Sequence, residues 1–153
     1  EIQIIQHNDA ALATADLSSA SSLWKAIAAD GSLVAPGTAG TIKLDWRSSK
    51  WTLVTDTLTD QSDSGRGTGF ASLATTLSTV PQILYGIGVY PKEPGGDYGG
   101  DELYAINKGE RLPIRGGRWD NTSNAGVFRL DLDNVRGSRG GHIGRRSAFV
   151  GSL

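Results

Sequence analysis

A short stretch near the end of the chain, residues 127–134, alternates apolar and polar side chains one by one. Since successive side chains of a β-strand point to opposite faces, this pattern predicts a half-buried strand. The apolar row and the polar row are, respectively, Phe128, Leu130 and Leu132, and Arg129, Asp131 and Asp133. We expect the apolar row to anchor the strand in a core and the polar row to face outward, where it offers one cation and two anions to a ligand.

Shorter alternations of the same kind predict further strands. Residues 42–46 and 51–55 alternate on the two sides of a polar connection, residues 47–50, which indicates a β-hairpin. Other strands are expected at residues 1–6, 83–89 and 103–106. The stretches 60–69 and 92–101 are rich in glycine and polar residues, and we expect loops there.

Two stretches have helical spacing instead. Between residues 16 and 30, apolar side chains recur every three or four positions, and Gly31 can end the helix. Residues 70–79 repeat the pattern up to Pro81, which cannot continue a helix. Two helices with short, mainly antiparallel strands form an α+β fold. Because no linker or internal repeat divides the chain, the sequence predicts a single domain over residues 1–153.

Composition excludes several classes of protein. The chain has 153 residues, 38% of them hydrophobic, which is typical of a globular domain. It has no cysteine, and this excludes disulfides, thiolate metal sites and thiol nucleophiles. No apolar run approaches the ~20 residues needed to cross a membrane, so we expect no membrane insertion. The chain begins at Glu1 rather than at a methionine, and we interpret it as a fragment or a processed product.

The net charge of −1 conceals an asymmetry between the two parts of the chain. Residues 1–114 carry five Lys and three Arg against nine Asp and four Glu, whereas residues 115–153 carry seven Arg against three Asp. A basic C-terminal third could contact nucleic acid. Aromatic residues on which bases could stack are few there, so nucleic acid is not the preferred partner.

The familiar catalytic and metal-binding patterns are missing. The two histidines, His7 and His142, are not accompanied by a G-x-S-x-G turn, so we expect no catalysis by histidine. The glycine-rich residues 65–69 lack the Gly-Lys-Ser/Thr ending of a nucleotide-binding loop, and we interpret them as a surface turn. Residues 95–102 carry three carboxylates, but their spacing differs from the calcium-binding EF-hand, and a solvated loop is the preferred interpretation. The sequence therefore predicts no catalytic, cofactor or metal site.

Three segments, 114–121 (IRGGRWDN), 124–128 (NAGVF) and 142–148 (HIGRRSA), together resemble the C-terminal variable region of proteins diversified by diversity-generating retroelements. Phage tail-tip receptor-binding proteins are the best-known members of this group, and they have a C-type lectin fold. The resemblance is close over residues 114–153 and extends to the rest of the chain only in general layout. It implies a C-type-lectin-like α+β fold in which residues 116–150 form the variable, ligand-binding region.

The composition of this region agrees with that resemblance. Such systems mutate adenines of a template, and from asparagine codons this reaches Asp, Ser, Gly, His and Arg but never Lys, Glu, Gln, Met or Trp. Residues 116–144 contain no Lys, Glu, Gln or Met, although the rest of the chain holds five Lys, four Glu and four Gln. Trp119 would then be an invariant scaffold position, and we expect it to pack under the surface.

The resemblance implies a binding surface made of these reachable polar residues, with arginines as forked donors and aspartates as acceptors. The predicted ligand-binding residues are Arg118, Asp120, Asn121, Asn124, Arg129, Asp131, Asp133, Asn134, Ser138, Arg139, Gly140, Gly141 and His142. The backbone beneath them would be held by Trp119, Phe128, Leu130, Leu132, Ile143 and Phe149. The expected partner is a protein or glycan receptor on a host or neighbouring cell, and the expected location is a virion tail tip or a cell surface. The sequence leaves the oligomeric state open.

Two other functions are weighed against this one. The formylglycine-generating enzyme family shares the fold and an R-G-G-x-W motif, but its chemistry relies on cysteine or on a metal that cysteine holds, and this chain has none. A basic nucleic-acid-binding module is the other, and its affinity would fall steeply with salt. We further expect residues 1–6 to pair with residues 146–150, which would bring the termini together.

Overall fold

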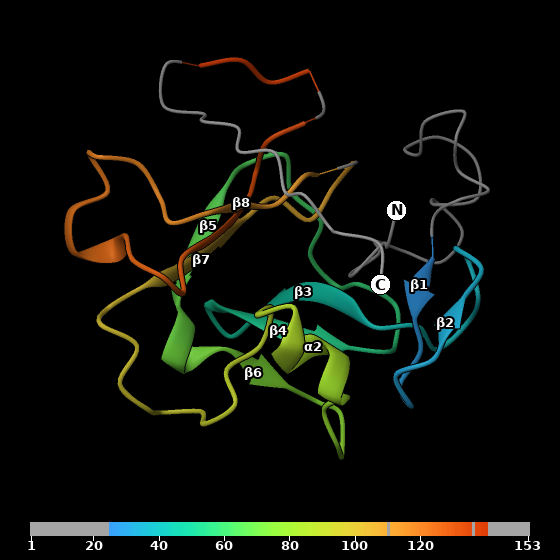
Figure 1. The fold of residues 1–153 in the computed structure, drawn as a ribbon. Coiled ribbons are helices and arrows are strands. Elements are labelled where there is room, and N and C mark those ends of the chain that lie inside the picture. Colours follow the sequence, from blue (N-terminus) through green and yellow to red (C-terminus); the bar gives the residue numbers. More distant parts are fainter. Residues whose placement is uncertain (1–24, 110, 136, 141–153) are drawn as a thin grey trace, which may run out of the picture.

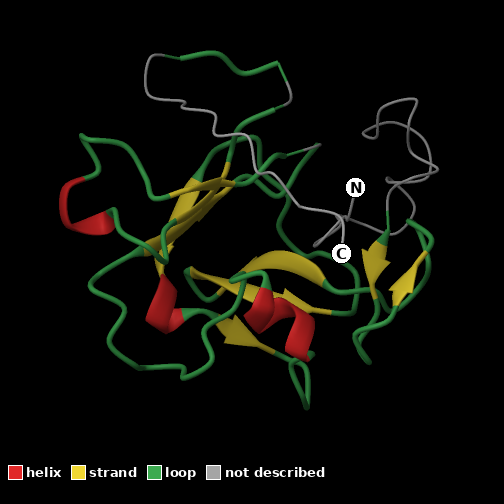
Figure 2. Ribbon diagram, in the orientation of Figure 1, coloured by secondary structure: helices red, strands yellow, loops and turns green. Residues whose placement is uncertain are grey.

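The computed structural model describes residues 25–109, 111–135 and 137–140. Within these ranges the elements are mostly short strands, with one short α-helix (Figures 1 and 2). In chain order they are β1 (Ala26–Ile27), β2 (Leu33–Val34), β3 (Lys43–Arg47), β4 (Lys50–Val54), β5 (Arg66–Gly69), the 3-10 turn η2 (Phe70–Ser72), β6 (Ala74–Thr75), α2 (Gln82–Gly86), β7 (Glu102–Ala105), β8 (Ile114–Arg115), the 3-10 turn η3 (Thr122–Asn124) and β9 (Leu130–Leu132). The described chain is thus mixed α+β, with strands dominant.

The hairpin predicted around residues 47–50 is confirmed. β3 and β4 pair antiparallel, with Trp46 opposite Trp51, and β6 adds a parallel third strand beside β4. The turn is shorter than predicted and consists of Ser48 and Ser49 alone. Both serines have positive φ, 49° and 61°, as in the tight two-residue turns whose twist matches that of the flanking strands.

Replacing these serines by the residues that such turns prefer is expected to stabilise the protein. A side chain with a Cβ is strained at positive φ, whereas glycine is not and asparagine is less so. The double variant Ser48→Asn/Ser49→Gly should raise the free energy of unfolding by about 1 kcal/mol, measured by urea denaturation. Ser64→Gly, at a residue without positive φ, should give no such gain. A double variant no more stable than the wild type would contradict the view that Ser48 and Ser49 are strained in this turn.

The second main sheet has the strand order β5-β7-β9-β8. β7 runs antiparallel to β5 and parallel to β9, and β8 runs antiparallel to β9. Leu103 lies opposite Leu130, and Tyr104 lies opposite Asp131. Since neighbouring residues in register share a face, the leucines occupy one face and Tyr104 and Asp131 the other. The leucine face is fully buried, and the opposite face is polar.

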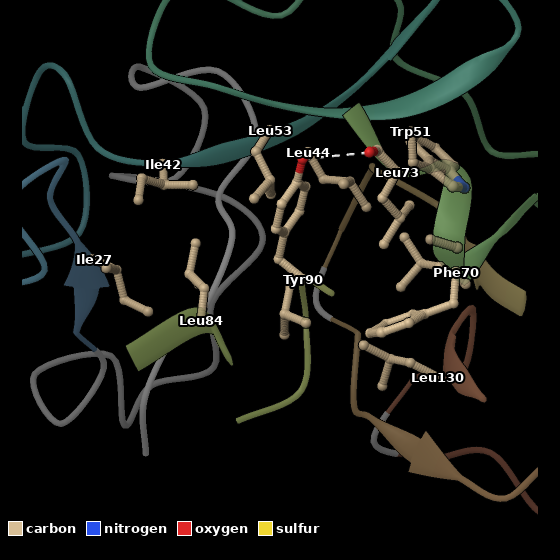
Figure 3. Close-up of a cluster of buried hydrophobic side chains, with 13 residues drawn as sticks. Ile27, Ile42, Leu44, Trp51, Leu53, Phe70, Leu73, Leu84, Tyr90 and Leu130 are labelled. Carbon is tan, nitrogen blue, oxygen red and sulfur yellow. Dashed lines mark hydrogen bonds between the residues drawn. The ribbon is translucent and has the colours of Figure 1, made fainter. Parts of the chain in front are cut away.

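The hydrophobic core joins the two main sheets (Figure 3). Its buried members are Ile27, Ile42, Leu44, Trp51, Leu53, Phe70, Leu73, Leu84, Val89, Tyr90, Leu103, Ala105 and Leu130. The Tyr90 hydroxyl, which burial removes from water, donates to the carbonyl oxygen of Leu73 at 3.3 Å. Leu130 of β9 lies beside Phe70 at one end of this core, which ties the predicted binding strand to the rest of the domain (Figure 3).

Neither predicted helix is found in the described residues. Residues 25–30 form β1 and a turn, and residues 16–24 lie outside the described ranges. Residues 70–79 contain η2 and then β6, because the Thr76 N–H donates to the Leu53 carbonyl oxygen of β4 at 2.9 Å. Sheet pairing of a threonine-rich segment here overrides helical spacing, since β-branched residues favour strands.

The strand predicted at residues 83–89 is also wrong, because this segment contains α2. Pro81 precedes the helix, where its missing N–H costs nothing, and the Leu84 N–H donates to its carbonyl oxygen. The fully buried side chains are Leu84 and Val89, which do not alternate. The helix is only five residues long and ends at Gly86.

The remaining predictions have mixed outcomes. The strand at residues 103–106 is confirmed as β7, and residues 92–101 form the predicted loop. The loop at residues 60–69 ends in β5, so the surface turn predicted at residues 65–69 is in fact largely a strand. The strand predicted at residues 127–134 is shortened to β9. The pairing predicted between the two ends of the chain, 1–6 with 146–150, lies outside the described residues.

No helix among the described residues is long and apolar enough to cross a membrane.

Candidate ligand-binding site

The alternation in β9 separates its side chains as predicted, but its polar row is not exposed. Leu130 is 1% exposed on the core side, and Arg129 and Asp131 are only 3% and 8% exposed on the opposite side. Asp133 is half-buried. The prediction that this row faces freely outward is therefore wrong for Arg129 and Asp131. Arg129 is enclosed by Glu102 and Tyr104 of β7 and by the Asn124 carbonyl oxygen of the segment between β8 and β9, and this segment also contributes Gly117, Arg118 and Asn121 to the lining of a pocket.

This pocket has a volume of about 340 Å³. Six of the predicted ligand-binding residues line it: Arg118, Asn121, Arg129, Asp131, Asp133 and Asn134. Four further residues complete the lining: Glu102, Tyr104, Ile114 and Gly117. The volume lies within the ~300–1,000 Å³ that is usual for small-ligand sites, so the pocket fits one side chain or a small molecule.

The Arg129 guanidinium is the central charge of the pocket. Its Nη1 donates to Glu102 Oε2 at 2.6 Å, and its Nη2 lies 3.5 Å from Asp131 Oδ2. The Tyr104 ring lies beneath it, with 5.8 Å between the guanidinium carbon and the ring centroid. The Nε of Arg129 has no hydrogen-bond partner among the described residues. Arg129 thus contacts the carboxylates of both Glu102 and Asp131, while its Nε–H has no acceptor among the described residues.

Asp131 occupies the floor of the pocket, between Tyr104 of β7 and Ile114 of β8. Its Oδ1 has no hydrogen-bond partner in the described part of the chain. Burial first, and then the nearby Asp133 carboxyl, raise the pKa of Asp131 to about 6, against the opposing charge of Arg129. Near neutral pH this carboxylate is therefore a buried acceptor whose charge is only partly balanced.

Two glycines beside the pocket, one just before β5 and one within it, leave room for Tyr104 and Glu102. A Cβ at Gly65 would collide with the Tyr104 ring, and a Cβ at Gly67 of β5 would collide with the Glu102 carboxylate. Glycine at both positions lets Glu102 and Tyr104 lie across β5 and reach the pocket. The glycine-rich segment, interpreted from sequence as a surface turn, thus helps to shape the wall of the site.

The residues that sequence reasoning did not predict as pocket residues are Glu102, Tyr104, Ile114 and Gly117. The signal available for the first two was the alternation within β7, whose even-numbered side chains lie opposite the buried Leu103 and Ala105. Sequence could not tell that β7 pairs with β9, because 24 residues separate these strands and their parallel pairing leaves no hairpin signature.

Asp101 anchors the segment between β8 and β9, which contributes to the pocket lining. This residue is 4% exposed, and its Oδ2 accepts the Phe128 N–H at 2.7 Å. Its backbone carbonyl accepts the Phe70 N–H at 2.7 Å, so it links the segment before β9 to the core. A Cβ at Gly126 would collide with the Asp101 carboxylate, which explains a glycine at that position.

Removing this anchor is expected to loosen the segment before β9. Asp101→Ala leaves the Phe128 N–H without its acceptor and should lower the free energy of unfolding by about 2 kcal/mol. Gly126→Ala should also destabilise, because the added methyl group displaces the same carboxylate. Thermal denaturation measures both effects. Asp97→Ala, in the same loop but exposed, is the matched control and should change stability little.

The remaining predicted residues lie outside the pocket lining. Asp120 is paired with Arg118 at 3.3 Å, and the Ser138 hydroxyl accepts the Val135 N–H at 3.0 Å. Asn124, Arg139 and Gly140 are exposed. Gly141 and His142, together with the scaffold candidates Ile143 and Phe149, lie outside the described residues.

Trp119 is 91% exposed, so the prediction that it packs under the surface is wrong. Val127 is exposed as well, and Phe128, predicted to be a core residue, is 41% exposed. Phe128 still contacts the core edge, with its ring centroid 4.9 Å from that of Tyr98 and 6.1 Å from that of Phe70. Large apolar side chains are therefore exposed on the segment between β8 and β9, beside the pocket.

Comparison with known proteins gives no match: no protein-family model and no curated protein matches the chain.

Proposed function

We propose that the chain is a ligand-binding protein of the kind diversified by retroelements, with a C-type-lectin-like fold and a variable surface in residues 116–150. The observation that supports the proposal is that six residues predicted from the sequence to bind ligand line one pocket. Arg129, Asp131 and Asp133 share one face of the strand region by alternation, and Arg118, Asn121 and Asn134 reach the same cavity from the flanking segments. The expected partner is a receptor protein or glycan on a host or neighbouring cell, met from a virion tail tip or a cell surface.

The geometry divides the proposed surface into a floor and a rim. The floor is formed by Arg129 and Asp131, which are buried, and by Glu102, which is half-buried, and Arg129 contacts both carboxylates. The rim is the exposed group Arg118, Asp120, Asn124 and Arg139. Variation is tolerable where a side chain contacts little, so we assign it to the rim and treat the floor as constant.

A folding library tests this division. The rim residues are randomised together in one library and the floor residues in a second, and folded members are selected by protease resistance on a display system. Most rim variants should remain folded and most floor variants should not, because the floor changes leave buried charges unpaired. A rim library no more tolerant than the floor library would contradict the proposal.

The source of the variation has a separate test in the encoding DNA. A near-repeat of the segment encoding residues 116–150 should lie beside a reverse transcriptase gene and differ from it mainly at adenines. Its absence from the complete surrounding sequence would refute the retroelement origin.

We assign no catalytic or cofactor role to these residues, and the carboxylates of the pocket disfavour a nucleic-acid backbone. Glu102, Asp131 and Asp133 would all repel phosphates.

A further inference from the structure

The carboxylate of Asp131 is buried among groups that compensate its charge only in part. Asp131 is 8% exposed, and its Oδ1 accepts no hydrogen bond from the described residues. Its close cation is Arg129, whose Nη2 lies 3.5 Å from Asp131 Oδ2, but the Nη1 of the same guanidinium lies only 2.6 Å from Glu102. Asp131 thus shares its cation with another carboxylate, which is the closer partner. A buried carboxylate in this position favours its protonated form.

A second carboxyl group lies beside Asp131. Asp133 follows two residues later, and since alternate side chains of a strand share a face, both carboxyl groups line the same pocket. Two neighbouring carboxylates repel each other when both are ionised, whereas a single proton lets one donate a hydrogen bond to the other. Asp133 acts on Asp131 in both ways, and both raise the pKa of Asp131.

The other cations near the pocket are engaged elsewhere. Arg118 pairs with Asp120 at 3.3 Å. The guanidinium groups of Arg111 and Arg115 donate to backbone carbonyl oxygens. The titratable and charged groups around Asp131 are therefore Glu102 and Tyr104 of β7, Arg118 of the segment between β8 and β9, and Arg129 and Asp133 of its own segment.

We propose that Asp131 and Asp133 form a proton switch: in mild acid they share one proton, which stabilises the fold around β9, and near neutral pH they lose it, which weakens that fold. This inference concerns how the floor of the pocket is held, and it does not depend on what the pocket binds. The proton is a small enough group to reach a carboxylate that is sealed from larger ligands.

The stability of the protein should therefore rise as the solution becomes mildly acidic. Burial first, and then Asp133, raise the pKa of Asp131 from its ordinary 3.8 to about 6 in the folded chain. A group with a higher pKa in the folded state stabilises that state when protonated, so the gain is complete below pH 3.8 and is lost as the pH rises through 6. Between pH 7.5 and pH 5.0 the equilibrium constant for folding should increase about tenfold.

Two other aspartates act in the opposite direction, but in a different pH range. Hydrogen bonds from Ser32 lower the pKa of Asp30. Burial raises the pKa of Asp45, but hydrogen bonds led by those from Thr59 outweigh it and lower this pKa overall. The stability that these two carboxylates contribute is lost as the pH falls through their folded pKa values, which lie below 3.8 and outside the range of the switch.

The test is urea denaturation of the full chain and of Asp131→Asn at pH 7.5, 6.0 and 5.0. Asparagine keeps the shape of the protonated carboxyl but cannot titrate, so the variant should lack the contribution of the switch. The ratio of the wild-type folding constant to that of the variant should increase about tenfold between pH 7.5 and pH 5.0. Taking this ratio also cancels the titration of His7 and His142, which lie outside the described residues. A ratio that does not change with pH would overturn the proposal.

A second measurement does not require the variant at position 131 to fold. The carboxyl ¹³C NMR signal of Asp131 in the wild type should titrate with a midpoint near pH 6. Asp133→Asn should move this midpoint to lower pH, because it removes the neighbouring charge and the acceptor of the shared proton. Asp63→Asn is the matched control, since Asp63 is exposed and pairs with Lys108, and it should leave the midpoint in place. A wild-type midpoint below pH 5, or one that Asp133→Asn does not move, would refute the shared proton.

Discussion

Replacing Arg129 by alanine is expected to lower the free energy of unfolding by about 3 kcal/mol, a large effect for a residue outside the hydrophobic core. The change removes the cation that lies between Glu102 and Asp131 and leaves two largely buried carboxylates without it. Urea denaturation at pH 7.5 measures the loss. Part of the loss should be recovered near pH 5.0, because Asp131 then becomes neutral and no longer needs the cation.

The matched control is Arg118→Ala in the same pocket. Arg118 pairs with Asp120 at 3.3 Å, and both side chains are more than two-fifths exposed, so its removal should change stability little. If the two alanine variants were equally stable, Arg129 would not be a structural residue and the division between floor and rim would fail.

Replacing Leu130 by alanine should cost a similar amount, about 3 kcal/mol, for a different reason. Leu130 is the fully buried β9 side chain of the core, and it is 1% exposed beside Phe70 (Figure 3). Truncation leaves a cavity at the place where the binding strand joins the domain. Thermal or urea denaturation gives the magnitude, and this loss should not depend on pH between 5.0 and 7.5.

Val127→Ala is the control for the leucine. The two residues lie three positions apart, but Val127 is 82% exposed and fills no cavity, so its truncation should be nearly neutral. A loss as large as that of Leu130→Ala would show that the segment before β9 is packed differently from the arrangement described above.

The sequence predicted well what depends on alternation within one strand. It placed Leu130 and Asp131 on opposite faces, and it located the hairpin of β3 and β4. It could not predict that the polar face of β9 would be buried, because that burial depends on Glu102 and Tyr104 of the distant strand β7. Polar alternation indicates only a face that lacks apolar packing, and such a face can be an open surface or the floor of a pocket.

The failed helices have a physical explanation of the same kind. Helical spacing of apolar residues in residues 70–79 is a local signal, and a backbone bond from Thr76 to β4 outweighs it. At residues 83–89 a strand was predicted and a helix is found. This helix, α2, begins after Pro81 and ends at Gly86, and it is too short for the spacing of its apolar residues to indicate a helix. Pairing between distant strands, as between β7 and β9, has no local signal at all, and the missed pocket residues Glu102 and Tyr104 follow from that pairing.

The parallel pairing of β7 with β9 has a consequence for how the chain can change in length. Parallel neighbours are joined by a crossover rather than by a tight turn, and such a connection does not set their register. Residues 116–128 belong to the last part of that crossover, the 14-residue connection from β8 to β9, which is too long to set strand register as a tight turn does. Insertions and deletions near η3 can therefore alter the size and outline of the pocket opening while β7 and β9 stay in register. Relatives of this protein should differ there in loop length as well as in side chains.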